Sequence, residues 1–248
     1  MDLLLAIDTA TDVASVAVGT PEEVLATVTV TGARVQSAQI VQLVDQALGL
    51  AGAQGGKGIR GLAGVVVGDG PGSFTGLRIA WAAAKGLAHE RGLPISAVPS
   101  LMGAAAGVGG RGLVAGPIGA CFDALRGQVY GALYAFHPDR VDTLFAPAVL
   151  TIPELARLAS VRPRVVVGDG ALRYAAEIIA WSGAPPLGLE ALPPVAASLL
   201  ALVARAGAAR AIPDPYTAEP VYGRPAEAQA KWEARHGRPL PDPSRPTQ

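Results

Sequence analysis

The chain is poor in the residues on which secreted and metal-dependent proteins commonly rely. It has one cysteine, Cys121, so no internal disulfide can form, and its three histidines show no metal-binding spacing. The first residues carry Asp2 where a signal peptide would have basic residues, and their apolar run ends at Asp8. We therefore expect a cytoplasmic protein with no metal and no other cofactor.

The sequence also lacks long apolar runs and any excess of charge. Half of its residues are hydrophobic (50%), yet the longest candidate for a membrane span, residues 195–204, has only about half of the ~18 residues required. We expect it to be a buried helix. The 20 basic residues are balanced by 20 acidic ones. Since proteins that bind nucleic acid directly usually carry a basic surplus, any role on RNA should depend on a protein partner.

What the chain does contain is a repeated hexapeptide, VVVGDG, at residues 65–70 and 165–170. Three valines bounded by glycine are typical of a buried strand, and Gly-Asp-Gly then turns the chain towards a helix. Each copy is preceded by two apolar stretches around a polar turn, which predicts a β-hairpin. Asp8 and Asp123 occupy corresponding places at these two turns.

A helix is expected between each hairpin and its VVVGDG strand. The first covers residues 38–48 with Ser37 as its N-cap, and the second covers residues 153–159. The order of hairpin, helix, strand and helix therefore occurs twice, which chance explains poorly. We interpret the chain as a duplicated α/β unit. This is the plan of the actin, hexokinase and Hsp70 (ASKHA) superfamily, in which two hairpins face each other across a nucleotide cleft.

The predicted organisation is two lobes and a C-terminal segment. Residues 1–103 form the first actin-like lobe, which binds partners, and residues 104–218 form the second. The glycine-rich segment at residues 106–112 marks the connection between them. Residues 219–248 form the C-terminal segment, and its proline-rich end, with little to bury, is expected to be disordered.

The first copy of the repeat continues into a glycine-rich turn that the second copy lacks. Gly68, Gly70, Gly72 and Gly76 crowd this turn, and Ser73 is placed to cap the helix that follows. Such a turn can present backbone N–H groups to an anion at the positive end of a helix. It has neither the ending of a P-loop nor the spacing of a dinucleotide motif. Close packing against a neighbouring backbone explains the glycines equally well, so both alternatives stand.

The helix after this turn is apolar around most of its circumference, which exceeds what packing on one sheet requires. Its remaining stripe carries Arg78, Trp81, Lys85 and His89, a composition found at interaction hot spots. The helix at 38–48 is also apolar on more than one side. Either the second lobe covers these faces or they form a subunit interface, which we favour. The candidate interface residues are Ile40, Leu43, Val44, Ala47, Leu77, Arg78, Trp81, Ala83, Ala84, Lys85 and Leu87.

The two hairpin aspartates are the best candidates for catalysis, because hairpin residues hold metal and phosphate in active members of the superfamily. The first turn lacks the glycine that phosphate-binding hairpins commonly use. Hydrogen bonding within the turn is the alternative role for both aspartates, and the one we favour. The candidates for a vestigial anion or nucleotide site are Asp8, Thr9, Gly70, Gly72, Ser73 and Asp123.

Four segments resemble the TsaB (YeaZ) family and occur in that family's order. They are LAIDTAT at residues 5–11, GDGPGSFTGLRIA at 68–80, DALRGQVYGALY at 123–134 and AEPVY at 218–222. The similarity covers residues 1–232, and the GPGSFTG-x-R segment is highly specific. One departure is Gln36-Ser37-Ala38, where many relatives have His-Ser-Glu.

The resemblance implies a two-lobed actin-like protein that is a non-catalytic subunit of the bacterial complex making N6-threonylcarbamoyladenosine (t6A) in tRNA. In that system one enzyme makes threonylcarbamoyl-AMP, and the paralogue TsaD, which has a metal-binding histidine pair, transfers the carbamoyl group to tRNA. A TsaB protein is expected to bind TsaD, with the ATPase TsaE joining them, and to form a homodimer when alone. Contact with tRNA would be indirect. The alternative is an active ATP-dependent kinase or carbamoyl transferase of the same fold.

Overall fold

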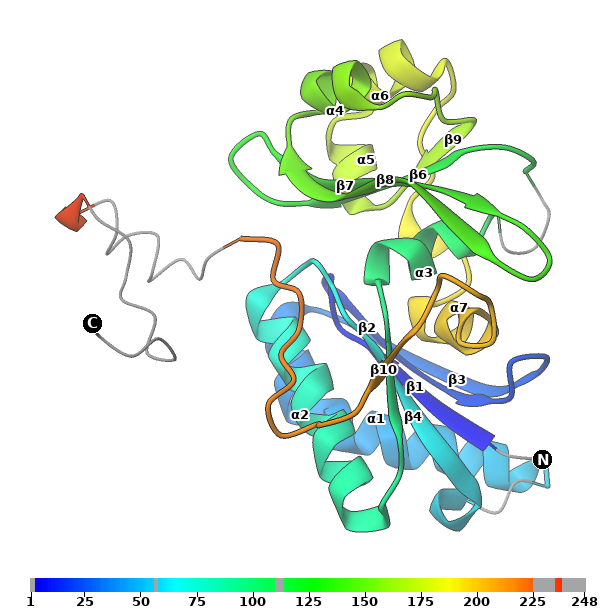
Figure 1. Cartoon of the computed structure of the whole chain (residues 1–248). Coiled ribbons are helices and arrows are strands. Elements are labelled where there is room, and N and C mark those ends of the chain that lie inside the picture. The colour runs from blue at the N-terminus through cyan, green and yellow to red at the C-terminus, as the bar shows by residue number, and fades with distance from the viewer. Residues whose placement is uncertain (1–2, 56–57, 110–113, 225–234, 238–248) are drawn as a thin grey trace.

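The protein has two β-sheets stacked along one axis with two helices between them (Figure 1). The computed structural model describes residues 3–55, 58–109, 114–224 and 235–237. The expected disordered end of the C-terminal segment and part of the predicted inter-lobe connection lie outside these residues. In the part of the chain that is described, no helix is long and apolar enough to cross a membrane.

The first sheet has six strands in the order β10-β5-β4-β1-β2-β3. Its strands are β1 (Leu3–Asp8), β2 (Val13–Gly19), β3 (Val24–Thr31), β4 (Leu62–Gly68), β5 (Ile95–Val98) and β10 (Arg210–Ile212). β1 pairs antiparallel with β2 and parallel with β4. This confirms the first predicted hairpin and the first VVVGDG strand, which are nearly continuous buried apolar runs, as central strands covered on both faces require.

The second sheet repeats this arrangement with four strands in the order β8-β7-β6-β9. Its strands are β6 (Ile118–Asp123), β7 (Val129–Phe136), β8 (Val141–Leu150) and β9 (Val165–Val167). β6 pairs antiparallel with β7 and parallel with β9, as β1 does with β2 and β4. The duplication inferred from the repeated hexapeptide is therefore present in the strand pairing.

Each hairpin carries a third strand that the sequence did not predict. β3 and β8 lie at the outer edges of their sheets and pair antiparallel with β2 and β7. Most of their residues are only partly buried, because an edge strand has a neighbour on one side only. A polar or exposed residue at every second or third position weakens the apolar signal from which the central strands were predicted.

The helices lie in three layers around the two sheets (Figure 1). They are α1 (Ala33–Ala53), α2 (Phe74–Arg91), α3 (Ser100–Ala106), α4 (Ile152–Leu158), α5 (Asp169–Arg173), α6 (Ala175–Ser182) and α7 (Val195–Leu202), with short 3-10 turns at Gly58–Gly61 and Leu189–Ala191. α1 and α2 cover the outer face of the first sheet. α3 and α7 lie between the sheets and pack on each other, and α4 and α6 cover the far side of the second sheet.

The helix ends confirm one predicted cap and correct another. The Ser73 hydroxyl accepts a hydrogen bond from the N–H of Gly76, so it caps α2 as predicted. α1 begins at Ala33, after Gly32, so the prediction that Ser37 caps a helix starting at residue 38 is wrong. Gly32 has a φ of 116° and leads the chain directly from β3 into the helix, a connection that the missed third strand had hidden. α4 confirms the helix expected at 153–159, shifted by one residue.

The chain returns to the first sheet before it ends. α7 packs on β1 and β2, and β10 pairs antiparallel with β5, although both lie within the predicted second lobe, residues 104–218. The division into residues 1–103, 104–218 and 219–248 remains our proposal. A division by sheet would instead place α7 and β10 with the first lobe, because their buried side chains pack there.

Candidate functional site

A cleft of about 490 Å³ lies where the turns of the two hairpins face each other. The turn between β1 and β2 forms one side, and the turn between β6 and β7 forms the other. The lining residues are Ala10, Thr11, Asp12, Gly72, Ser73, Phe74, Phe122, Asp123, Ala124, Leu125, Arg126, Tyr130, Asp169, Tyr222 and Arg224. The cleft is thus in the place where the superfamily plan puts a nucleotide.

Asp8 lies beneath this cleft and does not line it. Its side chain is fully buried, and both carboxylate oxygens have partners: Ser100 Oγ donates to Oδ2 at 2.5 Å, and the N–H of Ala10 donates to Oδ1 at 3.2 Å. Burial raises the pKa of Asp8 to about 6, against the lowering effect of the two hydrogen bonds. Gly68 is required beside it, since a Cβ there would collide with the Asp8 carboxylate. Asp8 therefore ties β1 to the start of α3.

The glycine-rich turn packs directly on the first hairpin turn. The N–H of Ser73 donates to the Ala10 carbonyl at 2.7 Å, and Thr9 Oγ1 donates to the Gly76 carbonyl at 2.5 Å. A Cβ at Gly72 would collide with the Ala10 backbone, and one at Gly76 with the Thr9 carbonyl. These contacts support the packing interpretation of the glycines. Anion binding at the turn stays a prediction.

Asp123 occupies the opposite side of the cleft and is held by the second lobe. Arg173 donates to Asp123 Oδ2 at 2.9 Å, and the N–H of Leu125 donates to Oδ1 at 3.0 Å. The backbone N–H of Asp123 is in turn directed at Asp169, whose pKa burial raises. The predicted role in hydrogen-bonding the turn is therefore observed for both hairpin aspartates. Both also contact groups far away in the chain.

Several cleft residues were not found from the sequence. Asp169 is the second-copy counterpart of Asp69 in the repeated hexapeptide, so the repeat itself carried a signal for it. Leu125 and Arg126 lie in the second hairpin turn, as the sequence indicated, but no sequence pattern predicted their positive φ angles of 61° and 54°, which non-glycine residues rarely adopt. Tyr222, in the C-terminal part of the chain, also lines the cleft, and nothing in the local sequence predicts that the chain returns there.

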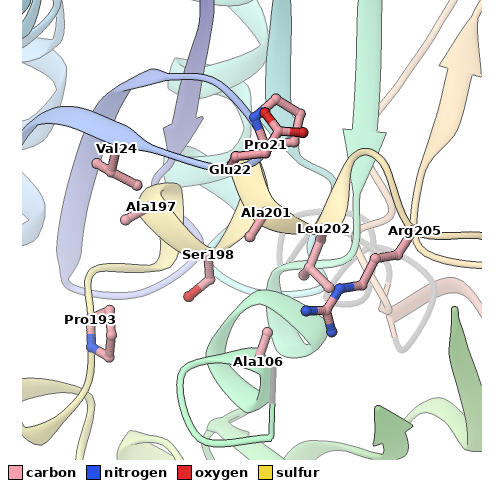
Figure 2. A pocket seen from close by; sticks show the side chains of 10 residues that line it. All are labelled: Pro21, Glu22, Val24, Ala106, Pro193, Ala197, Ser198, Ala201, Leu202 and Arg205. Atoms are coloured by element: carbon pink, nitrogen blue, oxygen red, sulfur yellow. The ribbon is translucent and has the colours of Figure 1, made fainter. Parts of the chain in front are cut away.

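A second hollow of about 200 Å³ lies at the junction of α7, α3 and the turn between β2 and β3 (Figure 2). Its lining is mostly apolar, from residues such as Ala106, Ala197 and Leu202, with Glu22 and Arg205 at its edge. It lies where α7 packs against the first sheet, and it is separate from the cleft between the hairpins.

Most of the predicted interface residues are buried inside the first lobe. These are Ile40, Leu43, Val44, Ala47, Leu77, Trp81 and Ala84. α1 and α2 lie side by side on the sheet, so each uses one apolar stripe against the strands and another against its neighbour. The buried residues of these second stripes therefore pack within this chain, although we favoured a subunit interface for them, and the interface itself stays a prediction. Of the remaining predicted residues, Arg78 is exposed, and Ala83, Lys85 and Leu87 are partly buried.

The predicted polar stripe of α2, of which Arg78 and His89 remain exposed, contacts residues from the C-terminal part of the same chain. Lys85 Nζ donates to the Ala218 carbonyl at 2.6 Å, and the hydroxyl of Tyr216 lies 2.6 Å from Nδ1 of His89. We call residues 214–224 the strap. Figure 1 shows the strap, in orange, running alongside α2. The stripe was read as a partner surface because nothing in the local sequence shows which segment returns to it.

A different line of small and apolar residues remains accessible on α2. Ala82 and Gly86 are exposed, and Ile79 is partly exposed. A Cβ at Gly86 would meet no atom within 4 Å. On α1, the side chain of Val41 is 66% exposed. The outer face of the helical layer therefore keeps a surface that another helix could approach closely.

Metal-ligating residues do not gather at either site. Among the described residues, no group of three or more His, Cys, Asp or Glu side chains could hold a metal ion. Cys121, on β6, is buried, and burial raises the pKa of its thiol far above the usual range. The residues that line the cleft supply carboxylates, guanidinium groups, hydroxyls and aromatic rings.

The comparisons with known proteins agree with this architecture. The family model described as tRNA N6-adenosine threonylcarbamoyltransferase (TsaD) matches residues 23–175. The tRNA threonylcarbamoyladenosine biosynthesis protein TsaB of Bacillus subtilis (strain 168) is 51% identical over 72 residues, which are 29% of this chain and 30% of that protein. The chain thus spans under a third of the length of the curated relative it matches.

Two solved structures from Pseudomonas aeruginosa cover far more of the chain. One is YeaZ, and the other is described as an uncharacterized protein with similarity to the peptidase YeaZ. Each is 27% identical, has a TM-score of 0.71, and covers 90% of this chain and 100% of its own. Fold and comparisons together define a two-lobed protein of the actin-like (ASKHA) class. The chain belongs to the family that the TsaD model describes and, among its members, to the TsaB (YeaZ) family.

Proposed function

We propose that this chain is a non-catalytic subunit that acts in t6A biosynthesis by binding and activating a TsaD-like paralogue, with a TsaE-like ATPase joining the complex. The main observation in support of the proposal is that Asp8 is buried and hydrogen-bonded within the fold. In an active enzyme of this fold a hairpin carboxylate must reach metal or phosphate in the cleft. Here Asp8 is fully buried and bonded by Ser100 and Ala10, so it supports the fold.

The cleft as a whole supports the same proposal. Asp123 is paired with Arg173, and the glycine-rich turn uses the N–H groups of Ser73 and Gly76 for its own packing. The resemblance to TsaB assigns the metal-binding histidine pair to the paralogue. In this chain, His89 lies on α2 and His137 follows β7, on different lobes. A subunit without its own reactive group can act by stabilising the productive form of its partner.

The outer face of α1 and α2 is the proposed contact with the paralogue, and with a second copy when the chain is alone. Ala82, Gly86 and Val41 are exposed there, and small residues allow two helices to approach closely. The zero net charge supports indirect contact with tRNA through the complex. The cytoplasm, where tRNA is modified, is the proposed compartment.

The direct test is light scattering after gel filtration, on the chain alone and mixed with the TsaD-like protein of the same organism. A one-to-one heterodimer should replace the homodimer. Ala82→Arg should abolish both, while the matched control Ala180→Arg, on exposed α6, should leave both intact. Leu43→Asp is unsuitable as a test, because Leu43 is buried and the variant would unfold. Association that survives Ala82→Arg would contradict the assigned face.

The size of the cleft keeps one alternative open, an active ATP-dependent kinase or carbamoyl transferase. A space of about 490 Å³ can hold a small ligand, and guanidinium groups of Arg126 and Arg224 line it. This alternative requires micromolar binding of ATP by the isolated chain. Calorimetry with ATP and Mg²⁺ decides between the two. We expect no heat of binding, and a saturable signal that Asp123→Asn removes would favour the enzyme.

A further inference from the structure

The strap, residues 214–224, contacts both lobes of the molecule. Its first part lies along α2, where Tyr216 meets His89 and Ala218 accepts a hydrogen bond from Lys85. Its last residues cross the glycine-rich turn and reach β7 of the second sheet. It therefore forms a connection between the lobes that is separate from the α3 and α7 layer between the sheets.

On the first lobe the strap is fixed at the glycine-rich turn. The N–H of Val221 donates to the Asp69 carbonyl at 2.9 Å, at the end of β4. The ring of Tyr222 lies against that of Phe74, with centroids 4.6 Å apart. Arg78 Nε donates to the Tyr222 hydroxyl at 3.2 Å, and its guanidinium lies 4.4 Å from the centre of the Phe74 ring. Phe74 and Arg78 are both in the first turns of α2.

On the second lobe the strap is fixed to Tyr130, in β7. Gly223 has a φ of 75°, and a Cβ there would lie 2.8 Å from both Pro71 and Tyr130, so only glycine fits between the two lobes. The guanidinium of Arg224 lies 5.5 Å from the centre of the Tyr130 ring. Arg224 also donates to Gln128 Oε1 at 3.3 Å. Three consecutive residues thus pass from one lobe to the other.

The same residues form a wall of the cleft between the hairpins. Tyr222 and Arg224 line it, together with Phe74 and Tyr130, to which they are bonded or stacked. We propose that the strap is a latch: with Tyr222 and Arg224 seated, it holds the lobes at one separation and closes one side of the cleft. When the latch is released, the lobes separate and the cleft opens on that side. The inference stands whether or not the chain is a TsaD-binding subunit.

The contacts that close the latch are individually weak, which suits a reversible device. Each is a ring stack, a cation–π contact or a single hydrogen bond, and none is a buried ion pair. Such contacts leave an open form as a minor population that local opening can reach. Removing the Tyr222 ring should therefore shift the opening equilibrium by about tenfold.

The test is hydrogen–deuterium exchange of the full chain, comparing Tyr222→Ala and Arg224→Ala with wild type. The informative amides are those of the turn between β6 and β7, where Ala124 and Gln128 are hydrogen-bonded. If the latch holds the lobes, both variants should exchange about tenfold faster in this turn, which lies in the other lobe from Tyr222. The radius of gyration from small-angle X-ray scattering should increase as well.

Tyr216→Ala is the matched control, because it removes from the same strap an aromatic ring that contacts His89 of α2. It should accelerate exchange near the end of α2 and leave the turn between β6 and β7 unchanged. If Tyr222→Ala fails to fold, the radius of gyration of Arg224→Ala decides the question, because Arg224 itself donates to Gln128 in that turn and its loss could speed exchange there locally. Exchange in that turn within about twofold of wild type would overturn the proposal, since the lobes would then be held without the strap.

Discussion

The Ser100 hydroxyl donates a 2.5 Å hydrogen bond to Oδ2 of Asp8, although the two residues are 92 positions apart in the chain. Ser100 Oγ also accepts from the N–H of Gly70, so one hydroxyl joins the first hairpin, the glycine-rich turn and the start of α3. In an ASKHA fold this is the place from which a hairpin carboxylate would act on phosphate. The hydrogen bonds instead fix three backbone segments around a fully buried acid.

The Asp8 carboxyl should make stability depend on pH. Its pKa is about 6 in the folded protein against 3.8 for an ordinary aspartate, as in the unfolded chain, so the folded state holds the proton more tightly. The stability this contributes is present below pH 4 and is lost as the pH rises through 6. Asp8→Asn has no carboxyl at this position and does not lose this stability. Relative to wild type, its free energy of unfolding should therefore rise by on the order of 2 to 3 kcal/mol between pH 4 and 7.

Guanidinium unfolding at several pH values measures this difference. Asp12→Asn is the matched control, because Asp12 lies four positions further along the same turn and is exposed. It should not reproduce the rise. A flat difference for Asp8→Asn would mean that Asp8 is ionised in the folded protein throughout this range.

Two glycines of α2 should respond in opposite ways to alanine. At Gly76 the added Cβ collides with the Thr9 carbonyl, so the turn and the hairpin must separate, at a cost of about 1–3 kcal/mol. At Gly86 the Cβ meets nothing within 4 Å, and alanine should stabilise the helix by up to about 1 kcal/mol. Thermal unfolding of both variants checks this. Equal effects would show that the close approach at Gly76 does not constrain the fold.

Removing the guanidinium of Arg210 should destabilise the protein through Asp69. Arg210 Nη2 lies 2.8 Å from Asp69 Oδ2, and the other oxygen, Oδ1, is buried without a hydrogen-bond partner among the described residues. The Asp69 side chain is 8% exposed and that of Arg210 is 54% exposed. Since water screens the pair on one side, Arg210→Ala should cost about 1–2 kcal/mol.

The pH dependence of this loss is a further check. Burial already raises the pKa of Asp69, and losing Arg210 should raise it further, so the loss should shrink as the pH falls and Asp69 is protonated in both proteins. Arg140→Ala is the control, because Arg140 pairs with the solvent-accessible Asp142, and its loss should cost clearly less than the loss of Arg210. An equal loss in both variants at every pH would contradict the account.

The sequence predicted the repeated core because its signal is local and strong. Both VVVGDG strands and both hairpins that turn at Asp8 and Asp123 are present, since continuous apolar runs bounded by polar turns are typical of central strands. The edge strands β3 and β8 were missed because partial exposure interrupts that signal. Missing β3 also placed the start of α1 at residue 38 instead of Ala33.

The site was harder to predict because its parts meet only through tertiary structure. The stripe of Arg78, Lys85 and His89 suggested a partner, and the segment that contacts it is the strap, from more than 120 residues later in the chain. Likewise, the burial of Leu43 and Trp81 follows from α1 packing beside α2, which periodicity along one helix cannot show. Sequence patterns located the apolar faces of α1 and α2, but they did not show which segments pack against those faces.

The most direct test of the central claim is a transfer assay that separates activation from catalysis. The incorporation of labelled threonine into tRNA would be measured with the threonylcarbamoyl-AMP-forming enzyme, the TsaD-like and TsaE-like proteins, and this chain carrying both Asp8→Asn and Asp123→Asn. A non-catalytic activator predicts no incorporation without the chain and a near wild-type rate with the folded double variant. Loss of incorporation with a double variant that still binds its partner would contradict the account and make the cleft an active site.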